Sequence, residues 1–356
     1  MSTATPGSPL LAGLNRPRRY DFADEVLLSS MEWTSLIELA DEPDRGAGVG
    51  RRGTIAIHDG GPNAPELSGV ELWREERRGE TLRKTCEGYL VAYRNGASFQ
   101  VSGDGNAVTV HGGEANSQAM VEHLLLDQVL PRLLDHRGLV VLHGAVVEIE
   151  GRAILLLGRT GAGKSTLAAS LAQAGGTLLS DDAIVLDWCG ETACARGTYQ
   201  GLRLWPESAR AVLREGVNSS PLSELPGSKL RIQTGQASVR SVPVSAVYLL
   251  NAESRPKVLT PLSARESCIA LLSNCFVLDP VDRGAAARRL SEIGRFVAAV
   301  PTFELAYPRE FSMLREVTDE IIRNVEGVEL HARHDVDHLA QGKHQECALG
   351  ERNGAA

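Results

Sequence analysis

The sequence predicts an α/β fold in which a phosphate-loop domain follows a smaller antiparallel β domain. Residues 153–157, AILLL, form a short apolar run of strand length, and a glycine-rich loop follows it directly. Residues 166–174 are then rich in Ala and Leu and end at a Gly pair, which is typical of a helix with a glycine stop. Upstream, residues 53–112 contain short β-type runs separated by turn residues, including Asn95-Gly96, the strongest short hairpin signal.

The loop at residues 158–165 reads GRTGAGKS and fits the pattern G-x-x-x-x-G-K-[ST]. Glycines allow successive backbone N–H groups to turn toward one phosphate, where a side chain would block the approach. Lys164 can reach the β- and γ-phosphates, and Ser165 can place its hydroxyl on Mg²⁺. The positive end of the following helix points at the same anion. Strand, loop and helix occur in this order, which favours a phosphate site over a chance glycine-rich turn.

Length and composition indicate an ordinary globular protein of two domains. The chain has 356 residues, 43% of them hydrophobic and 23% charged, and a net charge of −8. Without a basic excess or a strong basic stripe, a nucleic-acid partner is not expected. No apolar run approaches the roughly 18 residues of a membrane span, and the N-terminus lacks a signal-peptide core, so we expect a cytoplasmic protein. The six cysteines are scattered, and Cys189 and Cys194 have no His partners at zinc spacing, which favours reduced thiols.

The order of patterns along the chain predicts five segments. They are a disordered N-terminus over residues 1–20, a β-rich domain over 21–115, a bridging helix over 116–137, the phosphate-loop domain over 138–330 and a disordered tail over 331–356. Pro131 lies within the apolar stripe of the bridging helix and should mark a kink or a boundary.

Two features of the phosphate-loop domain distinguish it from a parallel βαβ fold. A hairpin, not a parallel strand, leads into the loop over residues 140–157. Residues 188–245 contain many Trp, Pro and Gly and are expected to be an irregular lid or substrate platform. Cations in this stretch, Arg203, Lys229 and Arg231, either meet phosphate or substrate charge or are ordinary surface residues. In the tail, His331, His334 and His338 have a spacing that allows a helical metal site, although a solvated tail is the favoured interpretation.

An acidic pair, Asp181-Asp182, begins 17 residues after Lys164, at the predicted end of a strand. Strand ends on that side of a phosphate-loop sheet face the phosphates. One carboxylate can therefore hold Mg²⁺, and the other can accept the proton of an incoming hydroxyl. The alternative is a simple turn-capping role. His143 lies 21 residues before Lys164 at another strand end, and alone it would more often be structural.

Together, L-H143-G, G-R-T-G-A-G-K164-S165-T and S-D181-D182 resemble the kinase domain of the HPr kinase/phosphorylase family, and more closely the wider set of HPr-kinase-like serine kinases. The match is specific over about residues 138–187 and looser over 198–310. The resemblance implies ATP- and Mg²⁺-dependent phosphorylation of a seryl hydroxyl on a protein or peptide, and a possible homo-oligomer. It assigns the base to Asp181, the metal to Ser165 and Asp182, and a place near the transferred phosphate to His143, with Lys164 also in the catalytic group. The residues that it places around the nucleotide phosphates are Gly158, Arg159, Thr160, Gly161, Ala162, Gly163, Lys164, Ser165 and Thr166.

The sequence also departs from the bifunctional enzymes of that family. Arg159 and Thr160 replace the Asp and Ser that are common there, Thr166 replaces an acidic residue, and the Gly-rich segment tied to dephosphorylation is missing. The resemblance therefore leaves open both the identity of the acceptor and the presence of phosphorylase activity. Two other functions stay open: an ATP-binding regulatory or assembly protein without transfer, and a small-molecule kinase or carboxykinase-like enzyme.

Overall fold

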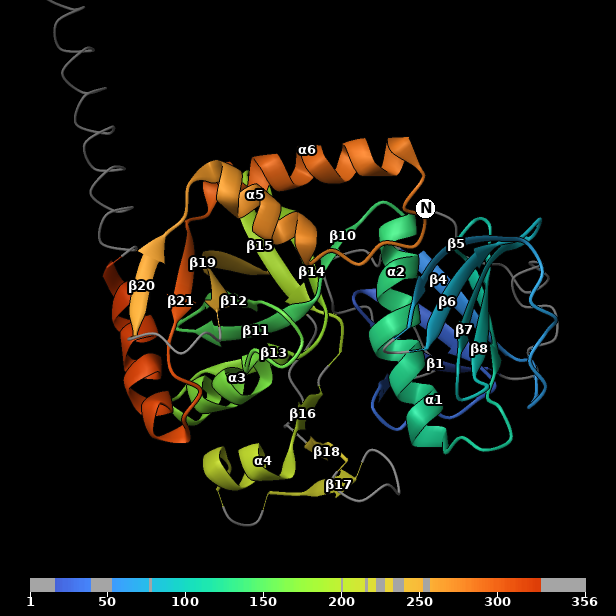
Figure 1. Ribbon diagram of the computed structural model, residues 1–356, viewed down its shortest axis with the longest axis horizontal. Helices are drawn as coiled ribbons and strands as arrows, with labels where there is room; N and C mark the ends of the chain where they lie inside the picture. The colour runs from blue at the N-terminus through green and yellow to red at the C-terminus, as the bar shows by residue number, and fades with distance from the viewer. Residues whose placement is uncertain are drawn as a thin grey trace, which may run out of the picture.

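A computed structural model describes residues 17–39, 53–76, 79–199, 201–214, 217–221, 228–232, 240–251 and 257–327. The histidines of the tail lie outside these residues. The fold is mixed α/β, with two nine-stranded sheets on either side of a bridging helix (Figure 1). Among the described helices, none combines the length and the apolar character that crossing a membrane requires.

The first sheet has the strand order β3-β1-β2-β4-β9-β8-β7-β6-β5. Strands β5 to β9 form the predicted antiparallel meander, in which Gly96 has a φ of +89° in the β7–β8 turn. The expectation of a purely antiparallel sheet is wrong at β4, which pairs parallel with both β2 and β9, because long connections return the chain to the same end of the sheet. The strands are β1 (Arg18–Phe22), β2 (Glu25–Ser29), β3 (Ile37–Glu38), β4 (Gly53–Asp59), β5 (Val70–Glu75), β6 (Glu80–Lys84), β7 (Gly88–Tyr93), β8 (Ser98–Ser102) and β9 (Ala107–His111).

This sheet also shows that ordered structure begins earlier than the sequence indicates. Strand β1 begins at Arg18, inside the segment expected to be disordered, because Tyr20 and Phe22 are buried in the sheet's core. His111 is also buried, and its Nε2 lies 3.0 Å from the Gln100 side-chain oxygen, so it serves the sheet and not a metal site.

The bridging helix has three parts: α1 (Gln118–Leu124), the π-helical turn η2 (Leu125–Val129) and α2 (Leu130–His136). Ser117 caps α1, its hydroxyl accepting a hydrogen bond from the Met120 N–H. Pro131 stands in the first turn of α2, which confirms the predicted boundary, since proline's missing N–H costs little there. The helix lies between the two sheets, and its apolar side chains pack against the first sheet.

The second sheet has the order β10-β14-β15-β19-β12-β11-β13, with β21 also beside β19 and β20 beside β21. Three of its strands, β12, β19 and β21, are mutually parallel, and β11–β12 is the predicted hairpin. The strands are β10 (Val140–Leu142), β11 (Gly144–Ile149), β12 (Arg152–Leu157), β13 (Thr177–Ser180), β14 (Ile184–Cys189), β15 (Thr192–Gly197), β19 (Val242–Asn251), β20 (Val258–Pro261) and β21 (Thr302–Ala306).

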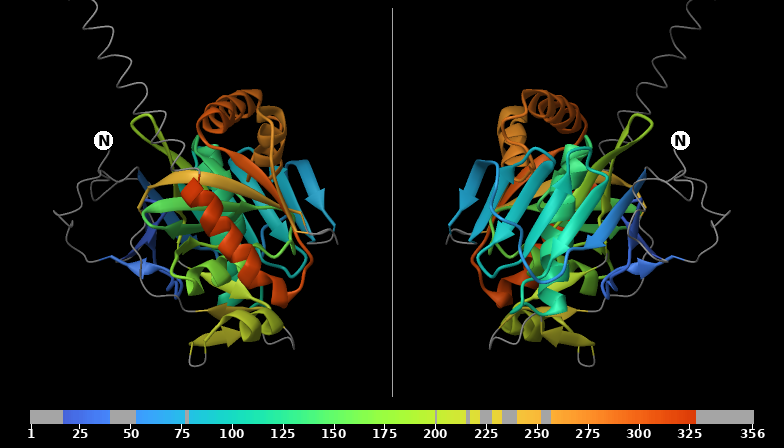
Figure 2. Two further views of the ribbon diagram at one scale, coloured as in Figure 1. Left: turned by 90° about the vertical axis from the view of Figure 1, so that its left-hand side faces the viewer. Right: turned by 90° about the vertical axis from the view of Figure 1, so that its right-hand side faces the viewer.

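Helices cover both faces of this second sheet. On one face, α3 (Lys164–Gln173) and a last helix over residues 314–327 bury Leu167, Val317 and Ile321 against β12 and β19 (Figure 2). On the other face, α5 (Ala264–Ser273) and α6 (Arg283–Ala299) pack against the same strands. Of these four helices, α3 occupies the segment after the glycine-rich loop that the sequence predicted to be helical. The sheet is thus the middle layer of an α/β/α sandwich, and the ends of its strands carry the loops described below.

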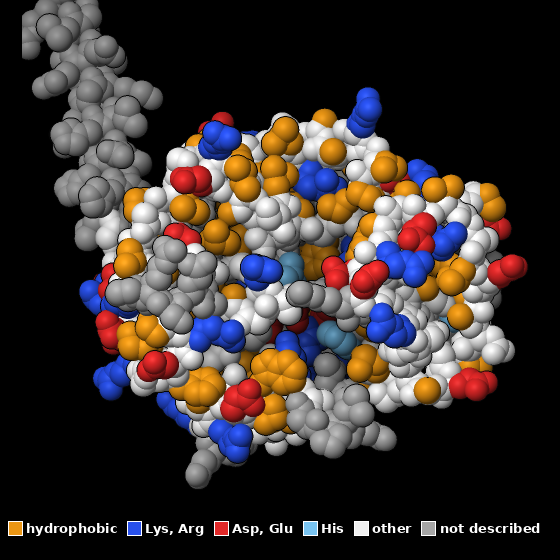
Figure 3. Space-filling model, viewed as in Figure 1, with side chains coloured by type: hydrophobic (Ala, Val, Ile, Leu, Met, Phe, Trp, Pro, Cys, Tyr) orange, Lys and Arg blue, Asp and Glu red, His pale blue; other side chains and the backbone are white. Residues whose placement is uncertain are grey.

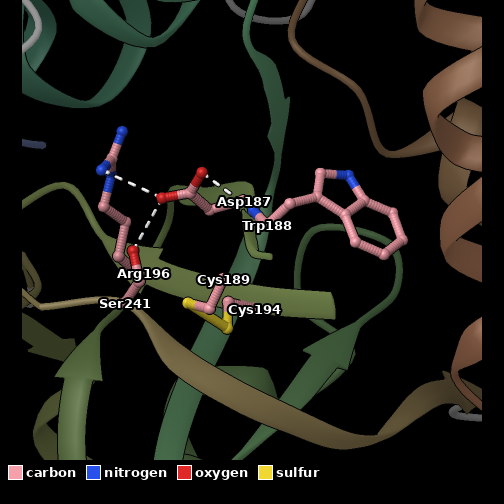
Figure 4. Close-up of a disulfide and its surroundings, with 6 residues drawn as sticks. All are labelled: Asp187, Trp188, Cys189, Cys194, Arg196 and Ser241. Atoms are coloured by element: carbon pink, nitrogen blue, oxygen red, sulfur yellow. Dashed lines mark hydrogen bonds and ion pairs between the residues drawn. A yellow bond between two sulfur atoms is a disulfide. The ribbon is translucent and has the colours of Figure 1, made fainter. Parts of the chain in front are cut away.

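Two expectations for residues 188–245 need correction. The stretch contains more regular structure than predicted, and small buried residues such as Ala193 and Ala195 account for the weak apolar signal of β15. Its other elements are β16 (Leu202–Leu204), α4 (Pro206–Val212), β17 (Ser219–Pro221) and β18 (Leu230–Ile232), the three strands forming a separate small sheet. Cys189 and Cys194 are also not reduced. The tight β14–β15 turn brings their Cα atoms to 6.2 Å, and they form a disulfide (Figure 4).

Candidate active site

The glycine-rich loop lies at the C-terminal end of β12, between that strand and α3. Gly158 has a φ of +141°, and a Cβ there would stand 2.8 Å from the Leu250 carbonyl oxygen, so only glycine fits against β19. Gly163 has a φ of +95° as it begins α3. The parallel strands β12, β19 and β21 all end at this edge, where ligands of open α/β sheets usually bind.

Lys164 lies folded across the loop that precedes it. Its ammonium group donates to the carbonyl oxygens of Gly158, at 2.7 Å, and Arg159, at 3.3 Å, and the residue is only 6% exposed. Carbonyl oxygens thus occupy the place around the ammonium that phosphate oxygens would take in a nucleotide complex. The loop therefore keeps a buried cation at the point where the sequence predicts phosphates.

The acidic pair follows β13, next to the loop helix. The Ser165 hydroxyl donates to Asp181 Oδ1 at 3.0 Å, and the Arg203 backbone N–H donates to Asp181 Oδ2 at 3.3 Å. Asp182 turns the other way, and its carboxylate pairs with the Arg203 guanidinium. Its φ of +84° is a left-handed conformation that a non-glycine residue holds only when its surroundings enforce it. The two neighbouring carboxylates therefore have different partners.

These different surroundings shift the pKa values of Asp181 and Asp182 in opposite directions. Burial and repulsion from Asp182 raise the pKa of Asp181 to about 7. Burial also disfavours charge on Asp182, but the Arg203 guanidinium overcomes it and, with His143 and Lys229, holds the pKa of Asp182 well below its ordinary 3.8. At neutral pH Asp182 is ionised, while Asp181 is near its titration midpoint. Acid–base assignments in enzymes commonly follow such a division.

His143 lies between β10 and β11, beside the acidic pair. Its Nδ1 is 3.0 Å from the Asp182 carbonyl oxygen, and because that oxygen can only accept, Nδ1 carries the hydrogen. The His143 ring packs edge-on against Phe276 at 5.7 Å, and its backbone N–H donates to the Asn274 carbonyl oxygen. Its tautomer and orientation are therefore set by neighbours from two other segments.

A cavity of about 540 Å³ opens over the loop, with residues 160–166 along one wall. Figure 3 shows the recess near the middle of the visible face, where acidic, basic and histidine side chains meet. His143, Asp182 and Arg203 also line it, and the segment after β21 contributes Tyr307, Arg309, Glu310 and Phe311. A second cavity, of about 340 Å³, adjoins it and shares His143 and Thr160. The larger volume is in the range of sites for drug-sized ligands.

The donors present suit a magnesium ion shared with phosphates. Among the described residues, no group of three or more His, Cys, Asp or Glu side chains is arranged to hold a metal on its own. Mg²⁺, however, is usually held by one or two carboxylates together with substrate phosphates and water. The Ser165 hydroxyl and the Asp181 carboxylate, 3.0 Å apart, provide oxygen donors of this kind.

The structure gathers the residues that the sequence singled out. His143, Asp182 and residues 160–166 line one cavity, and Asp181 lies directly behind it. Of the three cations in the following region, Arg203 and Lys229 line the cavity, whereas Arg231 pairs with Glu122. Other residues at the site were missed by sequence reasoning, because no motif marks them and only the fold brings them there. They are His123, Asp127, Tyr199, Trp205, Tyr307, Arg309 and Phe311.

Comparison with known proteins confirms the resemblance noted in the sequence. The chain is 32% identical over 124 residues to the HPr kinase/phosphorylase of Stenotrophomonas maltophilia (strain K279a), covering 33% of this chain and 38% of that protein. It is 40% identical over 58 residues to the HPr kinase/phosphorylase of Chlorobium phaeobacteroides (strain BS1), covering 16% and 17%. The chain thus aligns with less than two fifths of the length of either relative. No family model matches it.

Among solved structures, the Hpr(Ser) kinase/phosphatase from Coxiella burnetii superposes with a TM-score of 0.27 at 10% identity, over 53% of this chain and 98% of that one. A score this low does not establish a common fold. The likeness to HPr-kinase-like proteins therefore depends on sequence.

Proposed function

We propose that this chain is an ATP-dependent phosphotransferase that moves the γ-phosphate to a hydroxyl group, a seryl hydroxyl of a protein or peptide. The observation that carries the proposal is the single cavity that joins the Lys164 loop to an ionised carboxylate, Asp182, and to His143. A nucleotide switch needs the loop, but it has no use for a proton acceptor facing the same space. The curated relatives are themselves named as kinases.

In the proposed reaction the acceptor oxygen forms a bond to the γ-phosphorus, and the bond between that phosphorus and the β–γ bridging oxygen breaks to release ADP. Lys164 leaves its carbonyl partners for the phosphates and offsets their charge. Mg²⁺ bound at Ser165 would neutralise further charge on the phosphates. The proton of the acceptor hydroxyl passes to a carboxylate of the acidic pair.

The geometry favours an exchange of the two acidic roles predicted from sequence. The family resemblance assigns the base to Asp181 and the metal to Asp182, but the Ser165 hydroxyl contacts Asp181. Asp182 lines the cavity, where its carboxylate can orient the acceptor hydroxyl, whereas Asp181 does not line it. We therefore place Asp181 with Ser165 on the metal side, and Asp182 on the side of the acceptor hydroxyl.

Labelled ATP tests the function directly. The purified chain is incubated with γ-labelled ATP, Mg²⁺ and a degenerate library of serine-containing peptides, and label on peptide is measured. We expect transfer by the wild-type chain and none by Lys164→Ala. Lys257→Ala is the matched control, because Lys257 is a lysine paired with Glu316 and Glu320 away from the cavity. ATP binding without any labelled product would instead favour a regulatory protein.

A further inference from the structure

A buried carboxylate on the bridging helix has no part in the chemistry described so far. Asp127 lies in the middle of the π-helical turn Leu125–Val129 and is 0% exposed. Leu125, Leu126 and Val129 of the same turn are also buried, because the helix is enclosed between the two sheets. π-Helical turns often occur at functional sites, and a carboxylate in apolar surroundings must be paired. The partners of Asp127 therefore indicate its role.

Two of those partners, Tyr199 and Arg203, come from the segment that approaches the acidic pair, and the third, His123, lies one turn earlier on the bridging helix. The Tyr199 hydroxyl and the Arg203 guanidinium both donate to Asp127, and His123 Nδ1 lies 2.5 Å from Asp127 Oδ2. The other terminal nitrogen of Arg203 pairs with Asp182. Arg203 is only 3% exposed. Through these two contacts its guanidinium links two carboxylates, Asp127 on the bridging helix and Asp182 at the cavity.

We propose that Asp127 is a positioning residue, which fixes the Arg203 guanidinium so that Arg203 in turn holds Asp182 toward the cavity. The rigid, planar fork of a guanidinium suits this task, because partners at both ends define its position and its plane. The left-handed backbone of Asp182 makes such support necessary. This inference rests on the proposed phosphotransfer, in which Asp182 meets the acceptor hydroxyl.

The first sheet gains a role from this arrangement. Glu122, on the same helix, accepts hydrogen bonds from the Ser35 backbone N–H, at 2.6 Å, and the Thr34 hydroxyl, at 2.9 Å. The Tyr199 ring stacks on Phe22 of β1 with centroids 6.2 Å apart. The turn between β2 and β3 thus holds the helix that carries Asp127, and β1 holds the tyrosine that donates to it. In this account the N-terminal sheet completes the active site.

Asp127→Asn tests the inference against a matched control, Asp135→Asn. Asp135 is also a buried carboxylate on the bridging helix and makes two hydrogen bonds to Arg289, but it does not line either cavity. The assay is hydrolysis of Mg·ATP, with water as the acceptor. We expect kcat of Asp127→Asn to fall about 100-fold with KM for ATP within about threefold, since misplacing a reacting group by about 1 Å has an effect of that size. Asp135→Asn should keep wild-type kcat, and both melting temperatures are recorded.

A double-mutant cycle separates positioning from general loosening of the fold. If Asp127 acts through Arg203, the double variant Asp127→Asn/Arg203→Gln should be no slower than Arg203→Gln alone. Additive losses, or equal kcat for Asp127→Asn and Asp135→Asn, would overturn the inference. Should Asp127→Asn fail to fold, Tyr199→Phe is the second variant, because it removes one hydrogen-bond donor to Asp127. This variant should lower kcat about fivefold without raising KM. An unchanged kcat in Tyr199→Phe would count against the positioning role of Asp127.

A structural readout keeps the inference testable if the wild-type chain neither hydrolyses ATP nor labels peptide; absence of peptide labelling, and not absence of hydrolysis, would argue against the proposed function. Crystal structures of both variants are then compared. Loss of the Arg203–Asp182 contact in Asp127→Asn, with the contact intact in Asp135→Asn, supports the inference. An Arg203 that still holds Asp182 without the Asp127 carboxylate overturns it.

Discussion

Replacing Asp181 with Asn should make the nucleotide-free protein more stable, and increasingly so as the pH rises. Asp181 is 1% exposed and lies beside the ionised Asp182, and burial together with that repulsion raises its pKa to about 7. In an unfolded chain the same carboxyl should titrate near its ordinary value of 3.8. Between pH 3.8 and about 7, the Asp181 carboxyl ionises in the unfolded chain but stays largely protonated in the folded protein, and this difference lowers the free energy of unfolding. An asparagine cannot ionise, so the variant does not lose this stability.

The sign and size of the effect follow from proton linkage. The folded pKa is raised, so the contribution of Asp181 to stability is fully present below pH 3.8 and is lost as the pH rises to about 7. Each pKa unit corresponds to about 1.4 kcal/mol, so the whole effect is about 4 kcal/mol, of which about 3 kcal/mol falls between pH 5 and pH 7. Above pH 7 the difference between variant and wild type should level off.

Urea denaturation at pH 5, 6, 7 and 8, with EDTA present, measures this difference. The free energy of unfolding of Asp181→Asn minus that of wild type should increase from pH 5 to pH 7 and change little from pH 7 to pH 8. Asp279→Asn is the control with the opposite sign. Burial raises the pKa of Asp279, but the hydrogen bonds from Lys84 and Tyr89 outweigh burial and lower this pKa overall. Replacing Asp279 should therefore lower the free energy of unfolding by an amount that does not change with pH above pH 5. A difference for Asp181→Asn that does not change with pH would refute the electrostatic account of the pair.

Three further outcomes are expected. Lys164→Ala should weaken ATP binding at least tenfold in isothermal titration, because no other group takes the place of its ammonium in the loop; unchanged affinity would place the nucleotide elsewhere. Asp182→Asn should lower phosphoryl transfer about 100-fold or more at saturating Mg²⁺, whereas Asp181→Asn should chiefly raise the Mg²⁺ concentration needed for half-maximal rate, and the reverse pattern would restore the roles predicted from sequence. Peptide mapping without reductant should recover Cys189 linked to Cys194, while separate thiol peptides would contradict the disulfide.

The sequence predicted the parts of the fold that local pattern determines. The β11–β12 hairpin, the glycine-rich loop, α3 and the boundary at Pro131 all carry strong local signals, and each lies where it was expected. Where pairing depends on distant segments, prediction was weaker. The parallel pairing of β4 is decided by long connections, and no local pattern shows the direction in which a chain returns. Small residues likewise concealed β15.

The candidate site shows the same limit. Lys164, Ser165 and the acidic pair belong to short motifs with a chemical reason for each position, so sequence could identify them. Asp127 belongs to a helix that sequence showed only as an apolar stripe, and it meets Arg203 because the helix lies between two sheets. The division of roles between Asp181 and Asp182 depends on which way each side chain turns, which spacing along the chain does not determine.

Transfer of labelled γ-phosphate from ATP to a serine-containing peptide tests the central claim most directly. We expect acid-stable, base-labile label on serine with the wild-type chain, no label with Lys164→Ala, and wild-type labelling with Lys257→Ala. A wild-type chain that binds Mg·ATP at the loop yet labels neither peptide nor protein acceptors would contradict that claim.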